Sequence, residues 1–138
     1  MGFLLDTNIV SELRRGDRAN AGVITWFDGQ SPRELFLSVL TVGEIRQGIE
    51  QLRAKDKPQA TMLDRWVTGL VQFYEDRLIY VDGDIAEEWG RIRAARSVPV
   101  VDALIAATAR VHDLTLVTRN VRDFSKLRMR VLNPFTTS

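Results

Sequence analysis

Residues 3–10 read Phe-Leu-Leu-Asp-Thr-Asn-Ile-Val, a short apolar strand that ends at Asp6 and leads directly into a helix. The same alternation of short apolar strands and amphipathic helices continues along the chain, which favours an α/β fold with a parallel sheet and helices on both faces. In a right-handed strand–helix–strand unit, the helix begins at the carboxyl end of the strand before it. Strand ends and helix starts therefore share one edge of the sheet, the edge where open α/β folds hold their sites.

Hydrophobic periodicity predicts where these elements lie. Strands are expected near residues 2–6, 35–38, 78–81, 115–118 and 130–132. Helices are expected from residue 7 to about residue 16 and near residues 19–27, 41–53, 58–77, 84–96 and 99–112, with a short turn or helix around residue 123. Two helix starts carry a capping-box pattern, Thr41 with Glu44 and Asp84 with Glu87. The helix at 58–77 has a broad apolar face, which suits either the core or a dimer surface.

The composition is that of one globular domain, residues 1–138, with 45% hydrophobic and 27% charged residues. No apolar run reaches the roughly 18 residues that span a membrane. The first residues read Met-Gly-Phe-Leu-Leu-Asp without a basic region, so we expect a cytoplasmic location and no signal peptide. The chain has no Cys, which excludes disulfides and Cys-based metal sites. Its net charge is only +1, although 16 of its 19 cations are Arg, so nucleic acid would need a local basic rim.

Four acidic residues fall where the predicted fold places them at the same edge of the sheet. Asp6 and Asp123 follow predicted strands, whereas Glu44 and Asp102 lie near the starts of predicted helices. Four crowded carboxylates would repel one another strongly. One or two divalent cations would relieve that repulsion, because Mg²⁺ prefers carboxylate and other oxygen ligands. This pattern predicts metal-dependent phosphodiester chemistry.

Each acid also has a structural alternative. Asp6 can cap the helix that follows it, and Asp123 can cap a short helix or pair with the arginine before it. Glu44 can complete the capping box that begins at Thr41. Asp102 is the hardest to explain in this way, because the residues three, four and seven positions later on its helix are apolar. A carboxylate on such a stripe needs a cation, a proton or a hydrogen-bonding partner.

Further polar residues are expected around these acids. Thr118 and Asn120 follow the same strand as Asp123 and can supply oxygen ligands or orient the acids. Four arginines are candidates for steering phosphate, although each can equally be a solvated surface residue: Arg14, Arg15, Arg46 and Arg119.

Four blocks of sequence carry a family resemblance. They are Leu4-Leu5-Asp6-Thr7-Asn8, Thr41-x-x-Glu44-x-x-x-Gly48, Pro99-x-x-Asp102-x-x-Ile105-Ala106-Ala107-Thr108-Ala109 and Leu116-Val117-Thr118-Arg119-Asn120-x-x-Asp123-Phe124. In this order they resemble the PIN-domain ribonucleases, and within them the VapC-type toxins of type II toxin–antitoxin systems, close to the FitB-like subgroup. The resemblance covers essentially the whole chain, and all four blocks match.

The resemblance implies a three-layer fold whose central five-stranded parallel sheet has the order 3-2-1-4-5. It implies endonucleolytic cleavage of RNA that depends on Mg²⁺, or on Mn²⁺ as a substitute. Asp6, Glu44, Asp102 and Asp123 would be the catalytic and metal-binding acids, and Asn8, Thr118 and Asn120 would surround them. It also implies a homodimer, a cognate VapB-type antitoxin and a higher-order complex with that antitoxin.

Two other classes of function stay open on the sequence alone. A phosphoacceptor signalling domain would need a second acid before the first helix and a Lys after a later strand, and a haloacid-type phosphatase would need Asp where Asn8 stands. The other alternative is a catalytically idle module of the same fold that binds RNA or an antitoxin. Retention of all four acids favours the ribonuclease.

Overall fold

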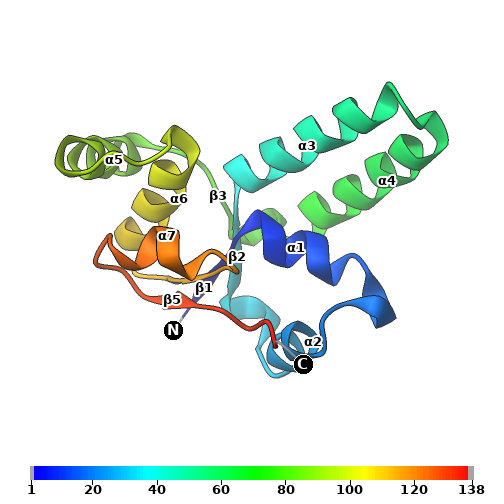
Figure 1. The fold of residues 1–138 in the computed structure, drawn as a ribbon, viewed down its shortest axis with the longest axis horizontal. Helices are drawn as coiled ribbons and strands as arrows, with labels where there is room; N and C mark the ends of the chain where they lie inside the picture. Colours follow the sequence, from blue (N-terminus) through cyan, green and yellow to red (C-terminus); the bar gives the residue numbers. More distant parts are fainter. Residues whose placement is uncertain (1, 137–138) are drawn as a thin grey trace.

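The computed structural model describes residues 2–136 (Figure 1). Its five strands are β1 (Phe3–Leu5), β2 (Leu35–Ser38), β3 (Leu78–Ile79), β4 (Thr115–Val117) and β5 (Val131–Leu132). Its α-helices are α1 (Thr7–Leu13), α2 (Ala21–Asp28), α3 (Val39–Arg53), α4 (Lys57–Phe73), α5 (Gly83–Ala95), α6 (Val100–Val111) and α7 (Val121–Ser125). Three short 3-10 helices lie at Gly16–Arg18, Pro32–Glu34 and Glu75–Arg77.

The strands form one parallel sheet in the order β3-β2-β1-β4-β5, as expected from the resemblance. The central strand β1 places Leu4 opposite Phe36 of β2 on one side and Leu116 of β4 on the other. Because β1 has neighbours on both sides, the residue that follows it lies in the middle of the carboxyl edge. That residue is Asp6.

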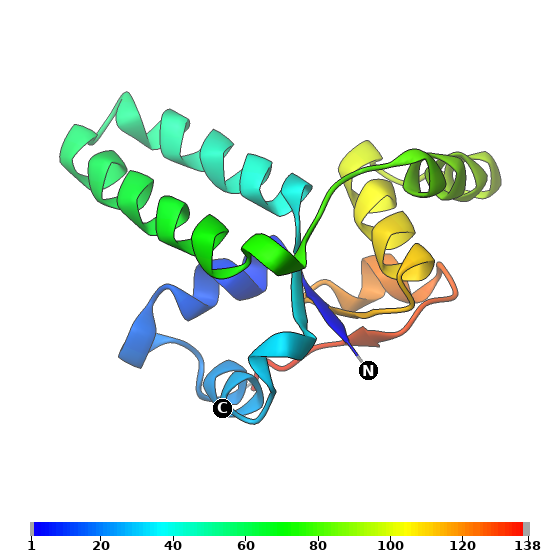
Figure 2. The ribbon, with the colours of Figure 1, turned by 180° about the vertical axis from the view of Figure 1, so that it is seen from behind.

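Alternating side chains of the central strands build two separate cores. Leu4 of β1 and Leu116 of β4 belong to one apolar cluster, whereas the next residues, Leu5 and Val117, belong to the other. This is the period-two pattern of a strand buried on both faces. Helices α5, α6 and α7 lie on one side of the sheet, and α1 to α4 lie on the other (Figures 1 and 2). The fold is therefore the expected three-layer arrangement.

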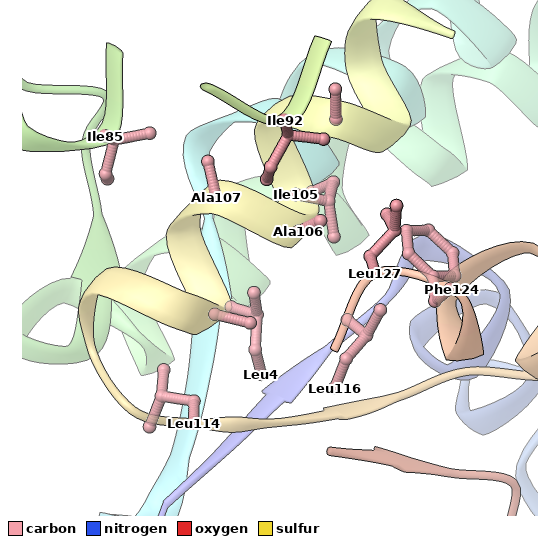
Figure 3. Packing of buried hydrophobic residues seen from close by; sticks show 12 residues of the cluster. Leu4, Ile85, Ile92, Ile105, Ala106, Ala107, Leu114, Leu116, Phe124 and Leu127 are labelled. Atoms are coloured by element: carbon pink, nitrogen blue, oxygen red, sulfur yellow. The ribbon is translucent and has the colours of Figure 1, made fainter. Parts of the chain in front are cut away.

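The first core is built around α6 (Figure 3). Alanines 103, 106, 107 and 109 are fully buried on this helix, so its backbone comes close to the sheet and to α5. Larger side chains fill the space around them, among them Ile105 and Phe124. This packing fixes the height of α6 against the sheet, and with it the position of Asp102 in the first turn.

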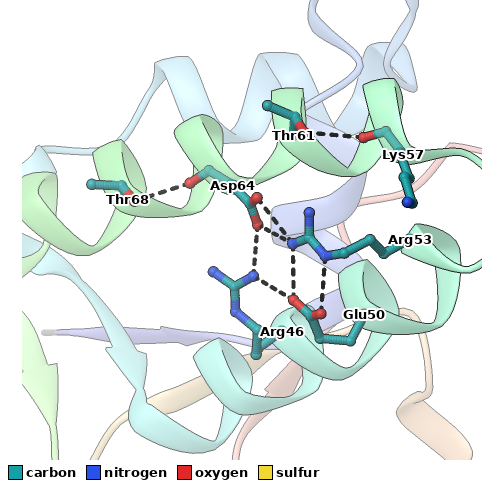
Figure 4. Close-up of polar contacts among 7 residues, drawn as sticks. All are labelled: Arg46, Glu50, Arg53, Lys57, Thr61, Asp64 and Thr68. Atoms are coloured by element: carbon teal, nitrogen blue, oxygen red, sulfur yellow. Dashed lines mark hydrogen bonds and ion pairs between the residues drawn. The ribbon is translucent and has the colours of Figure 1, made fainter.

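Helices α3 and α4 form an antiparallel pair held together by apolar packing and by a four-residue ion network (Figure 4). Arg53 of α3 contacts Asp64 of α4 at 2.7 Å and Glu50 of its own helix at 2.9 Å. Arg46 contacts the same two acids at 2.7 and 2.9 Å. Two positive and two negative charges are thus balanced within one network.

The expected apolar face of α4 is only partly core. Trp66 and Leu70 pack against the second core, whereas Met62 is 63% exposed and Phe73 is 55% exposed. No helix of the described residues 2–136 has the length and apolar character to pass through a bilayer.

Several expected boundaries were wrong, each for a local reason. Helix α3 begins at Val39 rather than Thr41, because the Ser38 side chain accepts a hydrogen bond from the N–H of Leu40. Helix α4 ends at Phe73 rather than near Arg77, and a separate 3-10 turn follows. The cap of α5 is Asp82 and not Asp84, since the Asp82 carboxylate accepts from the N–H of Ile85 at 3.0 Å.

Candidate active site

Asp6 lies at the carboxyl end of the central strand, and its side chain is held from two directions. It is the N-cap of α1 and accepts a hydrogen bond from the N–H of Thr7 at 2.9 Å. Its other oxygen accepts the Thr118 hydroxyl at 2.8 Å. The capping role considered for Asp6 is therefore real, but it uses only one of the two carboxylate oxygens. With 8% of its surface exposed, Asp6 is the most enclosed of the four acids.

Thr118 and Asn8 fix this carboxylate by joining the ends of β1 and β4. The Asn8 amide donates to the Thr118 hydroxyl oxygen at 3.1 Å and to Asp6 at 3.4 Å. The Asn8 carbonyl oxygen accepts from the backbone N–H of Arg119, and the Thr118 hydroxyl accepts from the backbone N–H of Asn120, both at 3.0 Å. Asn8 and Thr118 orient Asp6, whereas Asn120 contributes its backbone.

Glu44 reaches the site from α3 and does not belong to a capping box. Its position is the sixth residue of α3, and its carboxylate accepts the Thr7 hydroxyl at 2.5 Å. The hydroxyl of Thr41 is buried and has no hydrogen-bond partner among the described residues. The space beside Glu44 is open, because no atom of the described residues outside the helix lies within 4 Å of a Cβ placed at Gly43. The room expected there is present.

Asp102 and Asp123 face a common hollow of about 490 Å³. Helix α6 follows α5 rather than a strand, but it leads into β4 through a short turn and so runs against that strand. The first turn of α6, which carries Asp102, therefore lies at the carboxyl edge of the sheet. The rule that a helix begins where the preceding strand ends does not apply here, because no strand directly precedes α6. Asp123 lies in the first turn of α7, whose N-cap, Asn120, makes no capping hydrogen bond with its side chain. Asp123 is thus neither the cap nor, among residues 2–136, in an ion pair with Arg122.

The charges of the four acids act on one another. Burial raises the pKa of the Asp102 carboxyl above its ordinary value, and the negative charges of the other three acids raise that pKa further. None of the four is in an ion pair with Lys, Arg or His within the described part of the chain. No ion pair among residues 2–136 therefore neutralises these four carboxylates.

These residues fit a divalent cation of the magnesium type. No group of three or more His, Cys, Asp or Glu side chains among residues 2–136 is arranged to enclose an ion by itself. Mg²⁺, however, is usually bound through one or two carboxylates, with water and substrate phosphate in its remaining positions. The donor set is all oxygen, and its uncompensated charge favours a cation. Asp6, with a fixed orientation, and Asp102, with a repelled charge, are the residues best suited to hold it.

The four arginines proposed for phosphate occupy different surroundings. Arg46 is engaged by two carboxylates of the α3–α4 network. Arg15 pairs with Glu12 at 3.3 Å, and Arg14 lies over the Trp66 ring. Arg119 lies over the ring of Phe135, 4.6 Å from its centroid, while its backbone supports Asn8. None of the four lines the hollow at Asp102 and Asp123.

Sequence reasoning missed three contributors. Thr7 links Asp6 and Glu44, donating to each through a different group. Arg96 and Lys126 line the same hollow as Asp102 and Asp123. A signal for the cations was present, because Lys126 comes three residues after Asp123 and Arg96 six before Asp102.

Curated relatives match nearly the whole chain. Toxin FitB of Neisseria gonorrhoeae is 31% identical, over 96% of this chain and 98% of its own length. VapC ribonuclease Y4jK of Sinorhizobium fredii is 28% identical, over 96% of this chain and 97% of its own.

Solved structures agree with the sequence matches. The crystal structure of FitAcB from Neisseria gonorrhoeae matches with a TM-score of 0.86 and 30% identity, over 96% of this chain and 97% of that chain. A toxin-antitoxin complex from Klebsiella pneumoniae matches with a TM-score of 0.75 and 26% identity, over 99% and 100%. The family model of the PIN domain matches residues 3–128. The chain therefore belongs to the PIN-domain family.

Proposed function

We propose that this protein is a divalent-metal-dependent endoribonuclease and the toxin of a VapBC-type toxin–antitoxin pair. The observation that carries the proposal is the cluster of Asp6, Glu44, Asp102 and Asp123 at one edge of the sheet, with no cation of the protein paired to it. The names of the relatives give the chemistry its substrate class, since one is a toxin and another a ribonuclease.

The acids divide into an oriented pair and a free pair. Asp6 and Glu44 are both held by Thr7, and Asp6 also by Thr118, so their oxygens have fixed directions before any ligand arrives. Asp102 and Asp123 accept no hydrogen bond from a side chain of residues 2–136, and both face the open hollow. Such a division suits a site in which the oriented acids fix one side of the cation position and the free acids adapt as cation and substrate bind.

We propose Mg²⁺ as the cation, with Mn²⁺ as a substitute, held by the four acids with Asp6 and Asp102 foremost. When bound, it would neutralise the phosphate and lower the pKa of water, so that water can displace a sugar oxygen from phosphorus. Asn8 and Thr118 keep Asp6 in place by hydrogen bonds at its Oδ2 atom. Because Asn8 spans both strand ends, it also couples the positions of β1 and β4.

The partners follow from the same relatives. We propose a VapB-type antitoxin as the cognate partner, because a structural neighbour is a toxin-antitoxin complex. A homodimer, and a larger assembly with antitoxin, remain predictions that light scattering of the purified complex would test. We propose a cytoplasmic location, since the proposed substrate is RNA.

The experiment is cleavage of a mixed RNA pool by the purified protein with Mg²⁺, Mn²⁺ or EDTA, beside Asp6→Asn. Asn is as good an N-cap as Asp, so the variant keeps α1 capped while it removes one negative charge. Cleavage that requires the metal and disappears in the variant is the expected result.

Two results would count against the proposal. Equal cleavage by Asp6→Asn would point to a contaminating nuclease. Absence of cleavage with every metal, by folded protein freed of antitoxin that still binds RNA, would favour the idle binding module instead.

A further inference from the structure

Two adjoining hollows lie beside the acids, and cations line both of them. The first, of about 490 Å³, is lined by Arg96 and Lys126 as well as by Asp102 and Asp123. The second, of about 560 Å³, is lined by Arg128 and again by Arg96 and Lys126. The two hollows share Arg96, Lys126 and Leu127 in their linings, so they adjoin one another beside the acids.

Three of these cations are free, whereas their neighbours are neutralised. Arg91 and Arg110 also line the second hollow, but both pair with Glu88, at 3.2 and 2.9 Å. Arg96, Lys126 and Arg128 are exposed and make no ion pair with any residue from 2 to 136. We call these three residues the basic cluster.

The fold holds the basic cluster in place through a buried leucine and the end of a helix. Leu127 is only 5% exposed and packs into the core, and its N–H donates to the Phe124 carbonyl at 3.0 Å. Lys126 and Arg128, on either side of Leu127, are therefore kept at the surface. Arg96 ends α5, and its N–H donates to the Ile92 carbonyl at 3.1 Å.

Arg128 occupies a backbone conformation that does not favour arginine. Its φ of 52° lies in the left-handed region, which is easiest for Gly and next easiest for Asn or Asp. Local turn geometry therefore does not explain why a long cation stands here.

We propose that the basic cluster binds the phosphates of the RNA strand next to the one that is cut, an inference that rests on the proposed function. A phosphate at the acids requires flanking phosphates nearby, and the four carboxylates would repel them. Arg96 and Lys126 line the same hollow as Asp102 and Asp123, and Arg128 lines the adjoining one, so the positive charges of the basic cluster would offset that repulsion. Arg supplies a planar fork for phosphate oxygens, and Lys supplies a point charge.

The test is binding of a labelled single-stranded RNA of mixed sequence by the full chain in EDTA, where the proposed cleavage cannot occur. The triple variant Arg96→Gln, Lys126→Gln, Arg128→Asn is compared with the wild type over a series of salt concentrations. Each lost contact to a single strand lowers the slope of log affinity against log salt by about 0.7, so a fall of about 2 is expected. At low salt the affinity should drop at least about tenfold.

The matched control is Arg33→Gln. Arg33 is exposed, lies in the 3-10 turn just before β2 and so at the opposite edge of the sheet, and has no ion pair in the described chain. It should bind RNA as the wild type does. Arg128→Asn alone should fold at least as well as the wild type, because Asn accepts the left-handed backbone.

The outcomes separate this proposal from the proposed function. If the wild type cleaves RNA and the triple variant binds it with unchanged affinity and slope, the basic cluster is not the RNA site, although the ribonuclease stands. If the triple variant loses RNA binding but the wild type shows no metal-dependent cleavage, the result would support the RNA site and contradict the nuclease. If the triple variant loses only the binding of a polyglutamate peptide, the basic cluster serves an acidic protein and the proposal is wrong.

Discussion

The two regions of this protein rich in acidic side chains behave in opposite ways. At the carboxyl edge of the sheet, Asp102 lies among three other acids, and burial together with their charges raises its pKa. Between α3 and α4, Arg53 and Arg46 lower the pKa of Glu50 to about 2. The ionised carboxylate is thus destabilised at Asp102 and stabilised at Glu50. The difference lies in the burial of Asp102 and in the arginines that pair with Glu50.

This contrast distinguishes a network that stabilises the fold from a site that can bind a cation. Two acids and two arginines in the α3–α4 network satisfy one another and leave nothing for a ligand (Figure 4). The four acids of the site have hydrogen-bond donors for Asp6 and Glu44 but no ion pair with a cation among residues 2–136. An ion from solution can therefore lower the energy of the site but would gain little at the network.

The largest expected effect is on catalysis. Asp102→Asn should reduce metal-dependent RNA cleavage by at least about 100-fold, the upper end of the loss when a supporting residue of a metal site is replaced. Asp64→Asn, which removes one charge from the α3–α4 network, should leave the rate near that of the wild type. Initial rates on one RNA substrate measure both. Full activity of Asp102→Asn would remove Asp102 from the site and end the comparison.

The same two variants should change stability in opposite directions. In EDTA at neutral pH, Asp102→Asn should raise the free energy of unfolding, because it removes a charge that is partly buried and that the other acids repel. The gain is expected to stay below about 1 kcal/mol at this partly exposed position. Asp64→Asn should lower it, since Arg46 and Arg53 would face each other with one acid fewer. Urea unfolding monitored by circular dichroism gives both values. A shift of the same sign in both variants would contradict the electrostatic explanation.

The pH dependence should also have opposite signs. The pKa of Glu50 is lowered from 4.5 to about 2, so its contribution to stability is complete above pH 4.5 and is lost as the pH falls toward 2. The pKa of Asp102 is raised above 3.8, so the folded state binds its proton more readily and this residue costs stability as the pH rises through its folded value. Both residues are compared with their amide variants.

Urea unfolding in EDTA across this pH range measures the two contributions. Glu50→Gln should reduce the loss of stability that occurs as the pH falls toward 2. Asp102→Asn should remove the loss of stability that occurs as the pH rises through the folded pKa of Asp102. A wild-type profile that neither substitution changes would show that other groups control the acid response.

The smallest expected effect comes from two glycines of α3. A Cβ at Gly43 or at Gly48 would meet nothing within 4 Å among the described residues, so either Gly→Ala change should stabilise the helix by about 0.5–1 kcal/mol. Gly43 precedes Glu44 and Gly48 lies one helical turn after it, so both changes add a methyl group beside Glu44 and both are expected to lower RNA cleavage. Thermal unfolding measures the gain in stability, and initial rates measure the loss of cleavage. Wild-type rates in both variants would show that the open space beside Glu44 is not used by the substrate.

The sequence predicted the elements well and their ends less well. The apolar periodicity located all five strands and the main helices, because burial on one face or two leaves a repeating pattern. The errors were at caps. Ser38 rather than Thr41 starts α3, and Asp82 rather than Asp84 starts α5, since several residues near each start can accept the same backbone hydrogen bond.

The order of residues along the chain by itself determined the alternation of strands and helices, and with it one edge at which Asp6, Glu44, Asp102 and Asp123 were expected to gather. Tertiary structure alone decided which of them are held and which are free, because Thr7 and Thr118 reach Asp6 and Glu44 only when the ends of β1, α3 and β4 meet. It also decided that Arg46 is consumed by a network while Lys126 stays free beside Asp123. Charges interact through space over a few ångströms, and that spacing is set by packing rather than by position along the chain.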